Sequence, residues 1–266
     1  MKKSLIISII VLVLLVGLGS AFMIATGSST VKAQLHVEDG TATVNGKDVT
    51  GIVKLSEGDI IAAEGHATVI LYESVLVSLE PGAKITLDEL VNDHPQVSQQ
   101  EGRSISTFTK LAGVEQYSIK TDSTVASVRG TLFAFEDGYV LTGEGSVSVA
   151  FGGEDFTVNS GRVVEDGVER DATNEEMASI SAFLQRAIQE LRFLRQQEMD
   201  KHPILVSTAK SLYGLDDAGI NEKLEAADRG EINTDEAKAQ SPIQLDSLDK
   251  IADITKAIQQ LSAELG

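Results

Sequence analysis

The chain has 266 residues, of which 40 are acidic and 22 basic, so its net charge at pH 7 is −18. This negative charge argues against nucleic acid as a partner, because phosphate binding requires a positively charged surface. The sequence contains no cysteine, which excludes disulfide bonds, thiol catalysis and cysteine-ligated metals.

The first 29 residues predict a signal-anchor. Lys2 and Lys3 precede an apolar run, residues 4–27, that carries no charge and is long enough to cross a bilayer as a helix. The two lysines place the N-terminus in the cytoplasm and the bulk of the chain outside it. A cleaved signal peptide is the alternative, because Leu5 to Val16 has the length of a signal-peptide core. We therefore expect a single-pass cell-membrane protein, or a secreted one if the segment is cleaved.

Residues 34–170 predict a β-domain. Short apolar segments such as "ATVILYE", "AKITLDEL" and "SVSVAF" are separated by glycine-containing and acidic turns. Short strands at this spacing favour a sandwich, a barrel or a β-solenoid over βαβ units. Residues 64–82 and 144–161 share the order turn, strand, reversal, strand and turn, which predicts two similar hairpins and would fit two half-domains.

The segment "TVASVRGTLFAF", residues 124–135, predicts a central strand with apolar faces on both sides. Arg129 places a permanent charge among these apolar neighbours, and Gly130 suggests a bulge or a close backbone approach. A buried guanidinium needs a carboxylate or several carbonyl groups as partners. We therefore predict that Arg129 forms an internal ion pair or backbone clamp between the half-domains, with contact to a ligand as the alternative.

Residues 171–266 predict a helical region. Thr173 and Glu176 have the spacing of a capping box, and the helix that follows should end near His202, before Pro203. Its apolar stripe consists of Met177, Ile180, Leu184, Ala187, Leu191 and Leu194. A second striped helix is predicted after Pro242, with Leu248, Ile251, Ile254, Ile258, Leu261 and Leu265. Each stripe covers only about three heptads, which favours packing within the chain over a coiled coil between chains.

The sequence carries no recognisable catalytic or metal-binding pattern. The four histidines are scattered, and there is no nucleophile elbow, phosphate-binding loop or dinucleotide fingerprint. Residues 228–236 resemble the second half of a calcium loop, but two ligand positions of the first half fall on Ala227 and Arg229, which supply no oxygen. We therefore predict no enzymatic activity, no cofactor and no metal.

Three segments of the β region resemble the FecR domain family, the extracytoplasmic module of FecR-type transmembrane regulators. They are residues 54–90, residues 121–135 with "VRGT", and residues 143–167. The residues that carry the resemblance, which we treat as a structural signature, are Gly58, Asp59, Val128, Arg129, Gly130, Thr131, Phe133, Gly145 and Gly161.

The resemblance implies a membrane-tethered, all-β module that recognises a protein or a ligand outside the cell. Family regulators carry an anti-sigma segment ahead of the membrane helix, whereas only "MKKS" stands at this end of the chain here, so we expect no regulation of transcription by that route. The expected function is a non-enzymatic scaffold that binds an envelope protein or self-associates through the helical region. The alternative is an envelope sensor that binds a small ligand and signals through a separate membrane partner.

Overall fold

The computed structural model describes residues 32–109, 113–203, 206–207, 210–211, 214–234, 236 and 246–265. The predicted anchor, residues 1–29, lies outside these ranges, and within them no helix has the length and apolar character needed to cross a membrane. The chain divides into two compact units, which we call the β unit, Thr30–Phe183, and the helical unit, which contains Leu184–Gly266.

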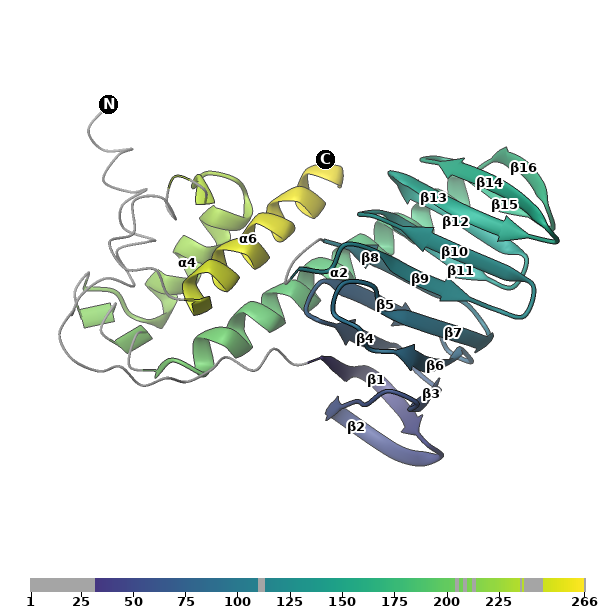
Figure 1. Cartoon of the computed structure of the whole chain (residues 1–266). Coiled ribbons are helices and arrows are strands. Elements are labelled where there is room, and N and C mark those ends of the chain that lie inside the picture. Colours follow the sequence, from purple (N-terminus) through teal and green to yellow (C-terminus); the bar gives the residue numbers. More distant parts are fainter. Residues whose placement is uncertain are drawn as a thin grey trace. The chain divides into compact units, whose positions relative to one another are not determined.

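Within the described part of the β unit, sixteen strands form one sheet (Figure 1). The strands are β1 (Ala33–Val44), β2 (Lys47–Lys54), β3 (Ile60–Ala63), β4 (Ala67–Leu71), β5 (Val75–Leu79), β6 (Lys84–Glu89), β7 (Gln96–Glu101), β8 (Ser104–Phe108), β9 (Tyr117–Lys120), β10 (Thr124–Val128), β11 (Leu132–Glu136), β12 (Tyr139–Glu144), β13 (Ser146–Phe151), β14 (Glu154–Asn159), β15 (Arg162–Glu165) and β16 (Val168–Asp171). All neighbours pair antiparallel except β7 and β9, which are parallel.

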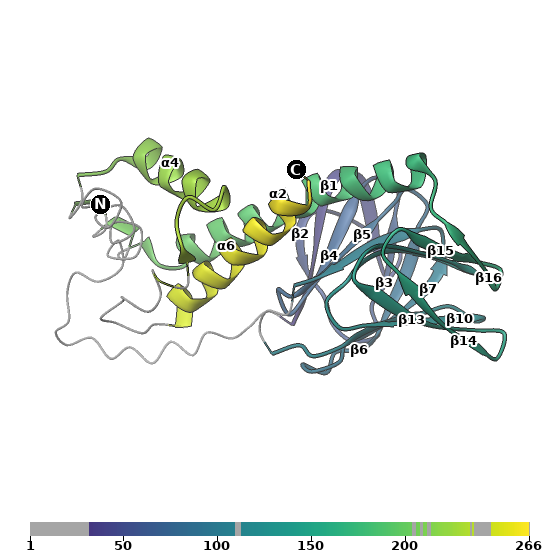
Figure 2. The ribbon, with the colours of Figure 1, turned by 90° about the horizontal axis from the view of Figure 1, so that it is seen from above.

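Along the chain, hairpins and the single strand β8 alternate between two branches of the sheet that both start at β1. One branch runs β1-β4-β5-β8-β11-β12-β15-β16, and the other runs β1-β3-β6-β7-β9-β10-β13-β14. The strand β1 belongs to both because its first half pairs with β4 and its second half with β3. Strands β4 and β5 lie on one side of the β unit and β6, β10 and β13 on the other (Figure 2). The sheet is therefore folded back on itself and nearly closed, which confirms the mainly β class.

The core of the β unit lies between the two branches. Val69 and Val77 of one branch and Val97 and Val128 of the other are buried in the same apolar cluster. The predicted hairpins at 64–82 and 144–161 are present as β4–β5 and β13–β14, but they belong to opposite branches of one sheet. One continuous core therefore replaces the two half-domains that the sequence suggested.

The helix α2 (Asn174–Asp200) begins with the predicted capping box. The backbone N–H of Thr173 donates to the Glu176 carboxylate at 2.7 Å, and the N–H of Glu176 donates to the Thr173 hydroxyl at 3.2 Å. The first turns of α2 lie against β12, because a Cβ placed on Gly143 would come within 2.6 Å of Cγ2 of Ile180. The capping box thus starts the helix at the point where the sheet ends.

The helical unit contains the remainder of α2, α4 (Asp217–Asp228) and α6 (Asp246–Glu264). The predicted stripe of α2 is buried from Ile180 to Leu194, and Ile254, Ile258 and Leu261 of α6 are buried as well. The amide of Gln259 donates to the carbonyl of Ala227 at 2.5 Å, which joins α6 to the end of α4. The prediction that the stripes pack within the chain is confirmed for α6. Leu265 lies past the helix end and is exposed, and the side chain of Leu248 lies outside the described set.

Candidate functional site

The segment 124–135 is not one buried strand. Strand β10 ends at Val128 and β11 begins at Leu132, and the chain crosses from one branch of the sheet to the other between them. Arg129 and Gly130 are exposed at this bend, and Gly130 has a φ of 102°, which favours glycine. Arg129 forms no ion pair or hydrogen bond with any residue that the structure describes. The prediction of a buried Arg129 clamp is therefore wrong.

The error has a physical cause in the alternation of side chains along a strand. In β10 the core-facing residues are Ala126 and Val128, whereas in β11 they are Phe133 and Phe135. In a continuous strand the core-facing residues are either all even-numbered or all odd-numbered. The change from even to odd numbers therefore requires a break between β10 and β11. Arg129 lies in the break, faces solvent and needs no internal partner.

Thr131, rather than Arg129, holds the bend in place. Its side chain is buried, and its hydroxyl donates to the carbonyl of Ser146 at 3.0 Å. Gly145 lies beside it with a φ of 76°, and a Cβ at this position would come within 3.1 Å of the Gly130 carbonyl oxygen. Gly130, Thr131 and Gly145 are thus brought together where the chain changes branch.

The other signature residues lie apart from this bend. The N–H of Gly58 donates to the Leu87 carbonyl at 2.7 Å, and the Asp59 carboxylate accepts from the Asn45 amide and the Ser56 N–H, both at 2.7 Å. The Asp59–Asn45 contact ties the β1–β2 turn to the start of β3, and the Gly58 contact ties the preceding loop to β6.

Val128 and Phe133 are core residues, and the N–H of Gly161 donates to the Thr142 carbonyl at 2.8 Å. The signature residues therefore stabilise turns or lie in the core, and they do not come together in a single binding site.

Arg129 borders a polar hollow of about 320 Å³ on the β unit. Its other lining residues are Asp93, His94, Gln96, Glu115, Gln116 and Ser118. Nδ1 of His94 lies 2.8 Å from Oδ1 of Asp93, whereas none of the residues that the structure describes pairs with the Arg129 guanidinium. A guanidinium of this kind can bind a carboxylate or phosphate through two parallel hydrogen bonds.

Replacing Arg129 with methionine should leave the folded protein as stable as the wild type. Surface substitutions away from caps and buried networks change the free energy of unfolding by less than about 0.5 kcal/mol. Urea unfolding followed by circular dichroism measures this difference. A loss of 2 kcal/mol or more, on the scale of about 3–5 kcal/mol known for broken buried ion pairs, would restore the clamp interpretation.

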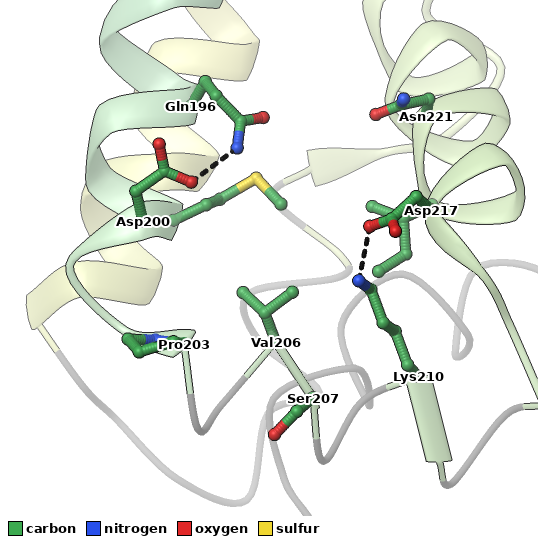
Figure 3. A pocket seen from close by; sticks show the side chains of 10 residues that line it. Gln196, Asp200, Pro203, Val206, Ser207, Lys210, Asp217 and Asn221 are labelled. Carbon is green, nitrogen blue, oxygen red and sulfur yellow. Dashed lines mark hydrogen bonds and ion pairs between the residues drawn. The ribbon is translucent and has the colours of Figure 1, made fainter.

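A second hollow, of about 530 Å³, lies in the helical unit between the end of α2 and the start of α4 (Figure 3). Met199, Pro203, Val206 and Ile220 give it an apolar part, and Ile220 is buried. Polar side chains surround this part: Gln196 donates to Asp200 at 2.7 Å, and Lys210 forms an ion pair with Asp217. The hollow thus combines an apolar floor with a charged rim.

Two clusters of buried charge lie inside the helical unit, and no local motif in the sequence marks either of them. The first is centred on Asp228, whose side chain is 2% exposed. Its carboxylate accepts from Nε of Arg192 at 2.9 Å and from Nη2 of Arg195 at 3.1 Å. Arg195 is itself buried, and its Nη1 donates to the Thr255 hydroxyl at 3.1 Å. This cluster connects α2, α4 and α6.

The second cluster is centred on Glu198, which is fully buried. Its carboxylate lies 2.8 Å from Nζ of Lys250 and 2.9 Å from Nζ of Lys201, and 3.5 Å from Nε2 of His202. Burial opposes ionisation, but the hydrogen bonds from Lys250 and Lys201 outweigh it and hold the pKa of Glu198 below its ordinary value. The cluster joins the end of α2 to α6.

A third network lies in the β unit around Glu176. Its carboxylate accepts from Nη1 and Nη2 of Arg170 at 2.9 and 2.8 Å and from the hydroxyl of Tyr139 at 2.9 Å. The hydrogen bonds from Arg170 hold the pKa of Glu176 well below its usual range. The guanidinium of Arg103 lies over the Tyr139 ring at 5.2 Å. The network fastens the last hairpin, β15–β16, to the first turn of α2.

Among the residues that the structure describes, no three carboxylate or imidazole side chains lie close enough together to hold a metal ion. In the segment that resembles half a calcium loop, Asp228 is the last residue of α4, and its carboxylate is bound by Arg192 and Arg195.

No protein-family model and no curated protein sequence matches this chain. Among solved structures, two crystal structures of a protein from Parabacteroides distasonis that is described as an anti-sigma factor are similar to it. The identity is 18% in both, with TM-scores of 0.37 and 0.38 over 44% and 45% of this chain. The chain spans 60% and 62% of the length of those chains. This is a distant and partial likeness of fold, from which no function is transferred.

Proposed function

We propose that this chain is a membrane-tethered, extracytoplasmic protein that binds another envelope protein and performs no catalysis. The uncharged run at residues 4–27, preceded by Lys2 and Lys3, supports the tether and the orientation. The single observation that carries the binding role is the hollow of the helical unit, with its apolar floor and charged rim.

The composition of this hollow matches the anchor pockets of protein interfaces. Such interfaces have an apolar centre that takes up a large side chain of the partner and a polar rim that remains in contact with water. Met199 and Ile220 supply the centre, and the Lys210–Asp217 ion pair supplies charges of both signs at the rim. The partner segment that fits is one with an apolar anchor residue flanked by charged side chains.

Filling the hollow should remove this partner. Asn221 lines the hollow and is exposed, so Asn221→Trp places an indole at its mouth without disturbing the core. We expect the amount of partner crosslinked to the full chain in native membranes to fall about tenfold, which corresponds to about 1.4 kcal/mol of binding free energy.

The matched control is Glu222→Trp, which adds the same side chain to the next residue of α4, exposed but outside the lining. The control should retain the crosslinked partner. Equal recovery with both variants, or recovery of none with the wild type, would count against a protein-binding role for this hollow.

A sensor for a small anionic ligand is the second candidate. The exposed Arg129, which has no ion-pair partner among the described residues and borders the polar hollow of the β unit, favours it. A ligand at 100 times its Kd stabilises the folded protein by about 2.7 kcal/mol. A carboxylate or phosphate compound that stabilises the wild type to this extent, and fails to stabilise Arg129→Met, would favour the sensor over the scaffold.

A further inference from the structure

The turn between β1 and β2 contains the only Asn-Gly sequence of the chain. Asn45 and Gly46 connect Val44 to Lys47, and both are exposed, with φ values of 53° and 74°. A left-handed conformation at both positions defines the two-residue hairpin turn for which Asn-Gly is the preferred sequence. The other five asparagines are each followed by a residue larger than glycine: Asn92, Asn159, Asn174, Asn221 and Asn233.

An Asn-Gly pair is the sequence most prone to spontaneous deamidation, because glycine has no Cβ beside its nitrogen to hinder the attack. The glycine nitrogen loses its proton and forms a bond to Cγ of the asparagine. The Cγ–Nδ2 bond breaks, and the amide nitrogen leaves as ammonia with that proton. Water then opens the resulting five-membered succinimide ring at either carbonyl, which gives aspartate or isoaspartate. Water is the only co-reactant, and the exposed turn has access to it.

In the folded protein Asn45 is held by three hydrogen bonds at the start of β3. Its Nδ2 donates to Oδ1 of Asp59 at 2.7 Å, and its Oδ1 accepts from the N–H of Ile60 at 3.0 Å. The backbone N–H of Asn45 donates to the Ile60 carbonyl at 2.8 Å. Ring closure eclipses Cβ and the glycine nitrogen about the Cα–C bond, which the left-handed turn does not allow. The turn must therefore open, and its bonds must break, before Asn45 can react.

The Asp59 carboxylate also opposes the reaction through its charge. The attacking nitrogen becomes negative when it loses its proton, and the tetrahedral intermediate at Cγ is negative as well. A carboxylate close to the amide raises the energy of both. Asp59 is itself fixed, because its Oδ2 accepts from the N–H of Ser56 at 2.7 Å. Asp59 therefore slows the reaction both by holding the amide and by repelling the charge that develops.

Deamidation would turn the contact between residues 45 and 59 from attraction into repulsion. The product side chain has no N–H to donate, and its carboxylate faces that of Asp59 where the amide made a bond of 2.7 Å. Among the described strands β2 pairs with β1 alone, and the contacts of Asn45 attach the tip of this hairpin to β3. Loss of these contacts releases the tip.

We propose that Asn45 is a deamidation site whose rate is controlled by Asp59, and that its conversion detaches the tip of the β1–β2 hairpin from β3. The modification is covalent, so it accumulates with the age of the molecule. It gives Asp59 a chemical role in addition to its structural one. The site lies in the β unit, so the proposal is independent of the partner binding proposed for the helical unit.

Mass spectrometry of the full chain after incubation in mildly alkaline buffer measures the reaction. Trypsin releases peptide 33–47, which contains the site, between Lys32 and Lys47. We expect Asn45 to react at least about tenfold more slowly in the folded wild type than in the same chain unfolded by urea. Asp59→Ala should react about tenfold faster than the folded wild type, which corresponds to about 1.4 kcal/mol in the free energy of opening.

Asp48→Ala is the matched control, because it removes an exposed carboxylate from the same hairpin and should keep the wild-type rate. Asp59→Asn keeps an acceptor oxygen for Asn45 and Ser56, so it tests the charge of Asp59 even where Asp59→Ala unfolds. In urea all variants should react equally. A folded wild type that reacts as fast as the unfolded chain overturns the proposal. Rates for both Asp59 variants that do not exceed that of Asp48→Ala overturn it as well.

Asn45→Asp places the main charge of the product at the site and tests the detachment. Hydrogen exchange in the turn and at the start of β3 should become at least about tenfold faster, while β4, β5 and β8 keep their protection. The control is Asn159→Asp, which adds the same charge at the exposed end of β14 and should leave exchange in the turn unchanged. Unchanged protection of the turn in Asn45→Asp would contradict the detachment.

Discussion

Asp228→Ala should destabilise the helical unit by about 3–5 kcal/mol, the range known for removing one partner of a buried ion pair. The substitution leaves the guanidinium of Arg195 buried without its carboxylate, and Arg195 is 5% exposed at its side chain. Arg192 loses the same partner. Because Arg195 also donates to Thr255, the loss should loosen the attachment of α6 as well as that of α4.

Hydrogen exchange on the full chain measures this effect by segment. Protection should fall in α4, α6 and the part of α2 after Phe183, while the strands of the β unit keep their protection. The matched control is Glu231→Gln, which removes a carboxylate from the exposed Arg229–Glu231 pair, whose side chains are 56% and 57% exposed. Exposed pairs contribute about 0–1 kcal/mol, so the control should change little. Equal small effects of both substitutions would show that the Asp228 cluster does not hold the unit together.

Glu176→Gln should cost about 2 kcal/mol of folding free energy in the β unit, because charged hydrogen bonds contribute about 1.5–3 kcal/mol. Glutamine can still accept from the N–H of Thr173, so the capping box survives in part. It loses the charge that pairs with Arg170. The expected result is a lower urea midpoint for the transition of the β unit.

The cost of this substitution should depend on pH in a defined direction. The pKa of Glu176 is lowered in the folded protein, chiefly by Arg170, so its carboxylate stabilises the fold fully at pH values above its unfolded pKa. That contribution is lost as the pH falls through the folded pKa. The difference between wild type and Glu176→Gln should therefore be constant near neutral pH and shrink below about pH 4.3, the ordinary glutamate pKa.

Glu175→Gln is the control for Glu176. It is exposed in the same first turn, so it reports the effect of the helix dipole without the Arg170 network. We expect less than about 0.5 kcal/mol from it. A difference between wild type and Glu176→Gln that stays constant from neutral to acid pH would contradict a role for the Glu176 charge.

The sequence predicted the start of α2, its apolar stripe and two hairpins correctly, because each of these features depends only on residues close together in the chain. The capping box of Thr173 and Glu176 and the stripe from Ile180 to Leu194 need only one helix to be recognised. The hairpins at β4–β5 and β13–β14 likewise follow from alternation and turn residues within about 18 residues.

The features that escaped prediction depend on residues far apart in the chain. Arg195 meets Asp228 across 33 positions and Thr255 across 60, and nothing local marks either pairing. Arg129 was misplaced for a related reason. Apolar residues on both faces of 124–135 are compatible with one central strand. They are equally compatible with two strands, one with even-numbered and one with odd-numbered residues facing the core. Only the packing of these residues against the rest of the core distinguishes the two arrangements. The hollow of the helical unit also combines residues from α2 to α4 that no motif connects.

The alternation of hairpins between the two branches has a consequence for how this domain can change length. Each hairpin pairs with a strand that precedes it in the chain on the same branch, so the strand order runs in one direction from β1 towards the last strands. Arrays in which each element contacts only its neighbours behave as nearly one-dimensional stacks. Gain or loss of two consecutive hairpins, one on each branch, would preserve every remaining strand pair. Domains of this kind with more or fewer hairpins could therefore keep the same strands around β1 and the same core between the branches.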